Sequence, residues 1–308
     1  MNPAWLATAA IIALTVAHCS THRHSGGTQT LFTVLKLTLI VVFSLAALMF
    51  SPMERQATFT WNTEDAALLG SGSFAVSLIY VTYAYSGWNA ATYISSELAA
   101  PQRSLPLVLG VSTLLVTALY CLLNFVFLTV APMDAMAGKI EVGVIAAEIV
   151  FGKTIGTAMG LLLALLLIST ISAMILAGPR VLHRIGQDYP RFARLARENH
   201  DGIPVTAILL QSVTALLFLW TASFEQILVF SGATMALNTF ATVLGLFVLR
   251  WQRPQLSRPF KVTLYPITPL IFLTVTGCTL VYIVVQRPIE ALISIAIVAS
   301  GGLFYWLV

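Results

Sequence analysis

The chain has 308 residues, of which 58% are hydrophobic and only 9% are charged, and its mean hydropathy is +0.90. A soluble domain cannot bury so large an apolar fraction, so the composition excludes a soluble globular protein and predicts an all-α, polytopic membrane protein held in a lipid bilayer. The formal net charge of +4 does not indicate a nucleic-acid partner, because the basic residues collect in loops between apolar segments.

Apolar segments long enough to cross the ~30 Å hydrocarbon core predict about nine transmembrane helices. They span residues 4–19, 31–50, 73–98, 105–130, 154–177, 204–221, 224–249, 268–285 and 289–307. The run 204–249 must turn back near residues 222–225, because as one helix it would measure roughly 70 Å. Residues 142–151 predict a short helix at the membrane surface.

Lysine and arginine in the loops predict the orientation of the helices in the cell membrane. One side carries only Arg55, Lys139, Lys153 and Arg287. The other side is predicted to be cytoplasmic, with the N-terminus outside and the C-terminus inside, because it carries Arg23, Arg103, Arg180, Arg184, Arg191, Arg194, Arg197, Arg250, Arg253, Arg258 and Lys261. The arginines between residues 178 and 200 are interpreted as a product of this topology rather than as a lipid- or partner-binding surface.

The stretch Ser73–Glu97 carries an unusual centre, Tyr85-Ser86-Gly87-Trp88-Asn89. Glycine is a weak helix former, and an asparagine amide in hydrocarbon needs a hydrogen-bond partner. Two interpretations stand open. The helix breaks here beside protein or a polar cavity and offers free backbone groups to a ligand, or it continues and Gly87 is a packing notch.

Other polar residues lie inside the apolar segments. Lys36 is either a functional residue at mid-bilayer or a side chain near the end of its span that reaches the headgroups. Most of the remaining ones are interpreted as structural, although the dense group Ser169–Ser172 and the amide of Asn238 could face a polar cavity. The set comprises Asn124, Ser169, Thr170, Ser172, Gln211, Thr234, Asn238 and Thr242.

The sequence has no pattern typical of an enzyme, a cofactor site or a metal site. It has no phosphate-binding loop, and the glycine–serine stretch 70–73 enters an apolar segment rather than a strand–turn–helix unit. The spacing of His18, His22 and His24 could hold a metal ion, but no acidic residue lies near them, so they are interpreted as part of a solvated loop. The far-separated cysteines predict neither a disulfide framework nor a metal site: Cys19, Cys121 and Cys278.

Several stretches resemble the amino acid–polyamine–organocation superfamily of permeases. The strongest, AYSGWNAATYISSELAAPQRSLP at 84–106, is similar to the broken sixth helix of L-type and related bacterial members. Further stretches follow the family's order: FTVLKL at 32–37, ILAGPRVLHRIGQD at 175–188, DGIPVTAILLQ at 201–211, FSGATMALNTFATVLGLFVLRWQRP at 230–254 and RPFKVTLYPITPL at 258–270.

The resemblance implies a fold of twelve helices, the first ten of which form two inverted five-helix repeats. The nine segments here correspond to helices four to twelve of a single transmembrane domain over 1–308. Residues 73–249 would form the complete second repeat, and 268–307 the two additional C-terminal helices.

The resemblance also implies roles at the sixth helix. Backbone near Ser86 and Gly87 would take the α-amino group of an amino acid substrate, and Tyr83 would be an aromatic gate that closes over it. Trp88 would pack beside the break, and Asn89 would contact the substrate.

A second group of roles concerns ion coupling. Lys36 would place its ammonium where sodium-coupled relatives hold a cation, and Ser169 and Ser172 would face that same region. Asn238 would belong to the gating wall of the tenth helix. A coupling proton or sodium ion is therefore a candidate partner, beside the amino acid.

The sequence departs from the family in lacking the first three helices, among them the glycine-rich break that holds the substrate carboxylate. Its start inside an apolar segment suggests a truncated reading frame or gene fragment. The expected function is secondary active transport of amino acids by alternating access. The alternative is a truncated or partner-dependent membrane protein without transport activity of its own.

Overall fold

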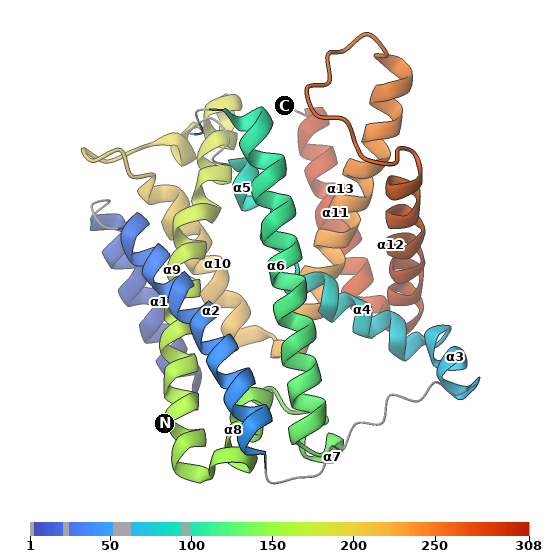
Figure 1. Ribbon diagram of the computed structural model, residues 1–308. Coiled ribbons are helices and arrows are strands. Elements are labelled where there is room, and N and C mark those ends of the chain that lie inside the picture. The colour runs from blue at the N-terminus through green and yellow to red at the C-terminus, as the bar shows by residue number, and fades with distance from the viewer. Residues whose placement is uncertain (1–2, 21–24, 52–62, 94–97, 99, 308) are drawn as a thin grey trace. The chain divides into compact units, whose positions relative to one another are not determined.

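A computed structural model of the chain describes residues 3–20, 25–51, 63–93, 98 and 100–307 (Figure 1). Within these ranges the regular structure is helical throughout and no strand occurs, which confirms the all-α class. The helices are α1 (Pro3–Ser20), α2 (Ser25–Phe50), α3 (Thr63–Leu69), α4 (Gly72–Ala84), α5 (Ala90–Tyr93), α6 (Pro101–Val130), α7 (Met133–Met136), α8 (Val142–Phe151), α9 (Lys153–Asp188), the 3₁₀ helix η2 (Pro190–Ala196), α10 (Val205–Thr221), α11 (Phe224–Gln252), α12 (Ile267–Gln286) and α13 (Pro288–Leu307).

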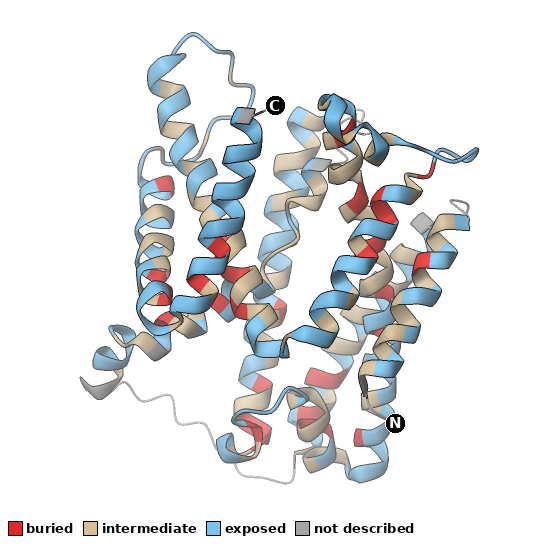
Figure 2. Cartoon of the chain, turned by 180° about the vertical axis from the view of Figure 1, so that it is seen from behind, coloured by how far each residue is buried: buried red, intermediate tan, exposed pale blue. Residues whose placement is uncertain are grey.

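Each expected membrane segment contains a helix, and the third contains two, α4 and α5. By length and composition, six helices could cross a membrane in the described ranges: α2, α6, α9, α11, α12 and α13. Large apolar side chains are exposed on these helices, for example Leu114 at 73% and Leu161 at 66%. Figure 2 shows that exposed residues run along much of the length of the helices. Water would disfavour such surfaces, whereas lipid tails do not, so the helices form a multi-pass membrane protein.

The chain forms two compact units. Unit 1 contains residues 1–60 and 110–216, and unit 2 contains residues 61–109 and 217–308. The division falls inside α6 and inside α10, so both helices contribute to both units.

The core of unit 1 is built where α2, α6 and α8 meet. Phe43 of α2 and Val126 of α6 are buried in it, together with Ala146 and Ala147 of α8. Figure 1 shows α8 turning back beside α9, and the turn is made at Gly152, whose φ of +84° suits glycine. The helix predicted at 142–151 is therefore confirmed, and it contributes two fully buried alanines to the core.

The core of unit 2 joins α4 to the three C-terminal helices. It consists of Ile79 of α4, Val229 and Ala233 of α11, Ile283 of α12 and Ala291 of α13. The predicted turn near 222–225 is confirmed. α10 ends at Thr221, and a capping box between Ser223 and Gln226 starts α11. The two side chains accept hydrogen bonds from backbone N–H groups that have no partner within the helix.

Polar contacts at one end of unit 2 hold the same helices together. Arg287, which caps α12, forms an ion pair with Glu225 in the first turn of α11. Glu225 also interacts with Tyr80 of α4. The hydroxyl of Tyr282 donates to the carbonyl of Gly70 at 3.0 Å, just before α4 begins. Side-chain contacts thus tie the segment before α4 to α12 and the second half of α4 to α11, in addition to the apolar packing.

In unit 1, η2 packs directly on the end of α9. Gly186 is buried there, and a Cβ built on it would lie 2.5 Å from the amide nitrogen of Ala196 and 2.9 Å from the carbonyl oxygen of Phe192. These are backbone atoms, which cannot rotate away as a side chain can. Only glycine permits this contact.

We expect Gly186→Ala to lower stability by about 1–3 kcal/mol, because the new methyl group overlaps backbone and must displace η2. Gly110→Ala in α6 is the matched control, since nothing lies within 4 Å of its added Cβ. There alanine should be neutral or stabilise the helix by up to about 1 kcal/mol. The apparent unfolding temperature in detergent checks both variants, and equal temperatures for the two would contradict the η2 packing.

Candidate functional site

The helix that starts with α4 is interrupted between Tyr85 and Asn89. α4 ends at Ala84, residues 85–89 form turns, and α5 begins at Ala90. Gly87 has a φ of +98°, a conformation that residues with a side chain rarely adopt. Of the two interpretations left open by the sequence, the structure supports the broken helix and not the continuous one. The far end of the predicted segment, residues 94–97 with Glu97, lies outside the described residues.

The interruption leaves backbone groups available for a ligand. The N–H of Tyr85 still donates to Val81 at 3.1 Å, and the N–H of Ser86 donates to Tyr83 at 2.9 Å. Among the described residues, the N–H groups of Gly87 and Trp88 and the carbonyl of Ser86 have no hydrogen-bond partner. In a bilayer such groups must be satisfied by protein, water or a ligand, which makes the break a candidate binding point.

The predicted site side chains around the break differ in exposure. Tyr83 is 37% exposed and Trp88 is 48% exposed, whereas Ser86 and Asn89 are half-buried. The carbonyl of Asn89 accepts from the N–H and hydroxyl of Thr92, at 2.9 and 2.6 Å, which starts α5. These residues have surface available for a ligand.

Asn238, the remaining predicted site residue of unit 2, is exposed on α11. Its backbone carbonyl accepts a hydrogen bond from the hydroxyl of Thr242 at 2.8 Å within the same helix. Because the residue is exposed, its amide side chain is not part of the buried core. Contact of this side chain with a substrate stays a prediction.

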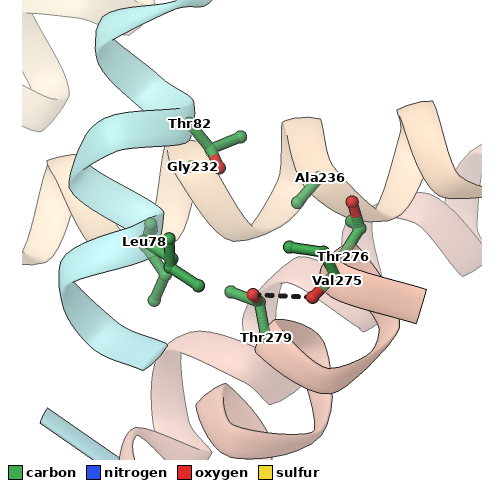
Figure 3. A pocket seen from close by; sticks show the side chains of 8 residues that line it. Leu78, Thr82, Gly232, Ala236, Val275, Thr276 and Thr279 are labelled. Atoms are coloured by element: carbon green, nitrogen blue, oxygen red, sulfur yellow. Dashed lines mark hydrogen bonds between the residues drawn. The ribbon is translucent and has the colours of Figure 1, made fainter. Parts of the chain in front are cut away.

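A small cavity of about 40 Å³ lies beside α4, between α11 and α12 (Figure 3). Its lining includes three threonines, and the hydroxyl of Thr279 donates to the carbonyl of Val275 at 2.9 Å. Gly232 of α11 faces it, and a Cβ there would lie 2.7 Å from Ile79 and 3.8 Å from the Cβ of Tyr83. This close approach was not predicted, because nothing in the sequence distinguishes Gly232 from other helical glycines.

The second group of predicted site residues lies in unit 1. The ammonium of Lys36 donates to the hydroxyl of Thr170 at 2.8 Å. Thr170 stands halfway along the 36-residue helix α9, so Lys36 is held at mid-helix. The ammonium therefore lies at mid-helix and does not extend to the end of its own helix, and its functional role stays a prediction.

The two serines beside Thr170 have different surroundings. Ser172 is hydrogen-bonded to Nε2 of His18 at 2.8 Å. Ser169 is 3% exposed, and its hydroxyl has no hydrogen-bond partner among the residues that the structure describes. The placement of His18 in a loop was wrong, since it lies in the last turn of α1; His22 and His24 lie outside the described residues.

Comparison with known proteins identifies the family. A family model described as amino acid permease matches residues 3–307. The chain belongs to the amino acid permease family. This match agrees with the resemblance of residues 84–106 and of the other stretches to permeases of the superfamily.

Curated relatives of this permease are amino acid transporters. It is 24% identical to b(0,+)-type amino acid transporter 1 of Mus musculus, over 98% of this chain and 62% of the relative. It is 27% identical to large neutral amino acids transporter small subunit 2 of Mus musculus, over 98% and 57%. It is 25% identical to Asc-type amino acid transporter 1 of Mus musculus, again over 98% and 57%. The chain spans about three fifths of the length of these relatives.

We expect Lys36 and Thr170 to be energetically coupled. Lys36→Met and Thr170→Val should each change stability, and the double variant should differ from their sum by about 0.6–1.7 kcal/mol, because one hydrogen bond is lost only once. Thr157→Val is the control partner, since its hydroxyl bonds to its own helix at Lys153. The free energies of unfolding in detergent of the unaltered chain, the two single variants and the double variant form a double-mutant cycle. Additive effects of the Lys36 and Thr170 substitutions would contradict the hydrogen bond.

Proposed function

We propose that this permease is a secondary active transporter of amino acids, or the larger part of one, that works by alternating access across the cell membrane. The observation that supports this most directly is the break at residues 85–89, which exposes backbone donors and an acceptor inside an apolar helix. Family membership supports the same function. The relatives carry names of amino acid transporters, from which we take neutral amino acids as the first substrates to test.

The proposed binding mode uses both ends of the break. The carbonyl end of α4 carries partial negative charge, which attracts the α-amino group of a substrate together with the free carbonyl of Ser86. Tyr83 is proposed as the gate above the bound amino acid, with Trp88 beside the break and Asn89 in contact with the substrate. Asn238 on α11 would contribute to the gating wall.

The proposed ion-coupling region lies in unit 1. The ammonium of Lys36 is hydrogen-bonded to Thr170 in the middle of α9. The preceding residue, Ser169, has a buried hydroxyl with no hydrogen-bond partner among the described residues. Together with Ser172 these groups would couple substrate movement to a proton or a sodium ion. The side of the chain that holds most arginines is proposed to be cytoplasmic.

A second candidate function rests on the name of one relative. The chain spans about three fifths of its relatives, and one of these is named a small subunit. The chain would then be a partner-dependent protein whose substrate site is completed by another polypeptide. Uptake by the isolated chain separates the two functions, because a chain that transports by itself needs no second polypeptide, whereas a partner-dependent chain does.

We expect Gly87→Leu to reduce amino acid binding by more than tenfold, since leucine disfavours the φ of +98° and fills the space needed by the substrate. Gly138→Leu is the control, because Gly138 has a φ of +69° and open space around its Cβ but lies after α7, outside the break. Binding of radiolabelled leucine to the purified full chain is the measurement. An unchanged affinity in Gly87→Leu would remove the break from the substrate site.

In proteoliposomes that contain only this chain, we expect uptake of leucine against an empty-liposome control. Its abolition by Gly87→Leu, but not by Gly138→Leu, would tie uptake to the break. If leucine binds and uptake is absent, the transport function is wrong for the isolated chain and the partner-dependent function replaces it.

A further inference from the structure

A pocket of about 230 Å³ lies in unit 2, where the end of α10 and the beginnings of α11 and α13 come together. A single water molecule needs only ~10–15 Å³ of cavity volume, so the pocket has room for a much larger group. It opens on the surface, since Phe218 is 37% exposed and Ile293 is 47% exposed. None of residues 85–89 line it, so it is distinct from the break.

The polar residues of the pocket lie at the helix ends, and the apolar ones lie about one turn deeper. Gln226 and Glu290 stand in the first turns of α11 and α13. Phe230 and Ile293 follow three or four residues later, and Phe218 stands three residues before the end of α10. Because α11 and α13 are long and apolar enough to cross a membrane, their first turns lie near the headgroup layer. The pocket therefore changes from polar to apolar in the same direction as a lipid molecule does.

Contacts between the helices hold the walls of the pocket in place. The rings of Phe218 and Phe230 are stacked, with their centroids 5.8 Å apart. On α13, the hydroxyl of Ser294 donates to the carbonyl of Glu290 at 2.8 Å and contacts the carbonyl of Phe230 on α11 at 3.3 Å. Ala291 of α13 is buried in the core of unit 2. The pocket is thus formed without a ligand.

Two polar side chains of the pocket have unused hydrogen-bonding groups. The carboxylate of Glu290 forms no salt bridge among the described residues, and the cation nearest to it in sequence, Arg287, is paired with Glu225. The side-chain oxygen of Gln226 accepts from the N–H of Ser223, so its NH₂ group is left as a donor without a partner in the described chain. The pocket offers one negatively charged acceptor and one neutral donor.

The helix dipole explains part of this arrangement. A carboxylate in the first turn of a helix is favoured by the partial positive charge at the helix N-terminus, so Glu290 stabilises α13 where it stands. The dipole does not explain why the acid borders an apolar pocket that also holds an amide donor. The charge of the carboxylate still selects the ligand, because it attracts an ammonium group and repels an anion.

The pocket complements a phospholipid whose headgroup carries a primary ammonium. The N–H groups of the ammonium would donate to Glu290, which only accepts, and the amide of Gln226 would donate to a phosphate or ester oxygen. The apolar wall of Phe218, Phe230 and Ile293 would contact the acyl chain. A choline headgroup has the same positive charge but no N–H donor. A glycerol headgroup leaves the lipid with a net negative charge, which the carboxylate repels.

We propose that this pocket binds phosphatidylethanolamine, with the ammonium on Glu290 and the acyl chain along the apolar wall. The bound lipid joins the ends of α10, α11 and α13 at one membrane surface. The inference needs only the membrane location of α11 and α13 and does not depend on transport.

The test measures binding of dioctanoylphosphatidylethanolamine to the purified full chain in detergent by native mass spectrometry. The phosphatidylcholine and phosphatidylglycerol of the same chain length are the comparison lipids. The unaltered chain should bind phosphatidylethanolamine about tenfold more tightly than phosphatidylcholine, because it alone forms a hydrogen bond to the charged carboxylate. Phosphatidylglycerol should also bind more weakly. Glu290→Gln keeps the shape of the side chain and should bring phosphatidylethanolamine and phosphatidylcholine to equal affinity.

Two further variants separate the pocket from net charge. Glu141→Gln removes the same charge from an exposed acid at the N-cap of α8, where its side chain forms no capping bond, and should keep the tenfold preference. Ala222→Leu fills the pocket that Ala222 lines and should weaken binding of phosphatidylethanolamine and phosphatidylcholine alike.

Equal affinity of the unaltered chain for phosphatidylethanolamine and phosphatidylcholine would overturn the proposal, as would equal losses in Glu290→Gln and Glu141→Gln. Unchanged binding of phosphatidylethanolamine by Ala222→Leu would also overturn it, because the lipid would then bind elsewhere. A dimer in detergent that dissociates in Ala222→Leu would show that a second copy of this chain, and not a lipid, occupies the pocket.

Discussion

Hydrogen bonding of the backbone governs this structure more than any side chain does. In a bilayer each N–H and C=O must find a partner, and a continuous helix provides one for nearly every group. The chain follows that rule along α2, α6, α9 and the three C-terminal helices. It departs from the rule at residues 85–89, and the contacts of unit 2 support this departure. Ile79 is in the core, Gly232 lets α11 approach closely, and Tyr282 anchors the segment before α4.

The two glycines near the break act in different ways. Gly87 is needed for its own backbone conformation, since its φ is positive and nothing lies within 4 Å of its Cβ position. Gly232 has ordinary helical geometry and is needed for its neighbour, because Ile79 occupies the space of a side chain. Gly87 therefore allows the backbone conformation of the break, and Gly232 allows α11 to pack closely against α4, the helix that leads to the break. A substitution at either position would disturb the same region through a different physical cause.

The helices were predictable because apolar length is a property of the sequence alone. The composition of 154–177 required a spanning helix, and Ser223 with Gln226 carries a recognisable capping pattern. Residue spacing did not predict whether the helix is interrupted at Gly87, since a glycine is compatible both with close helix packing and with a break. Whether the 1–308 chain behaves as one domain with an inverted repeat stays a prediction.

Contacts between distant helices were beyond the sequence. The bond from Lys36 to Thr170 joins residues 134 apart and depends on where α2 crosses α9, which periodicity cannot supply. The same holds for His18 and Ser172. The close approach of η2 to Gly186 was also beyond the sequence, because it depends on the path that the chain takes after α9.

The length of α4 has an electrical consequence. Its 13 residues extend about 20 Å, which is less than the ~30 Å hydrocarbon core, so a helix that starts at one interface stops within the bilayer. A charged group resting at the break would then stand partway through the membrane potential, whose full drop is worth about 2.3 kcal/mol per elementary charge at 100 mV. A zwitterionic ligand would move from solution to the break with little net electrical work. A cationic ligand would do electrical work against or with the membrane potential on the same path, before any conformational change began.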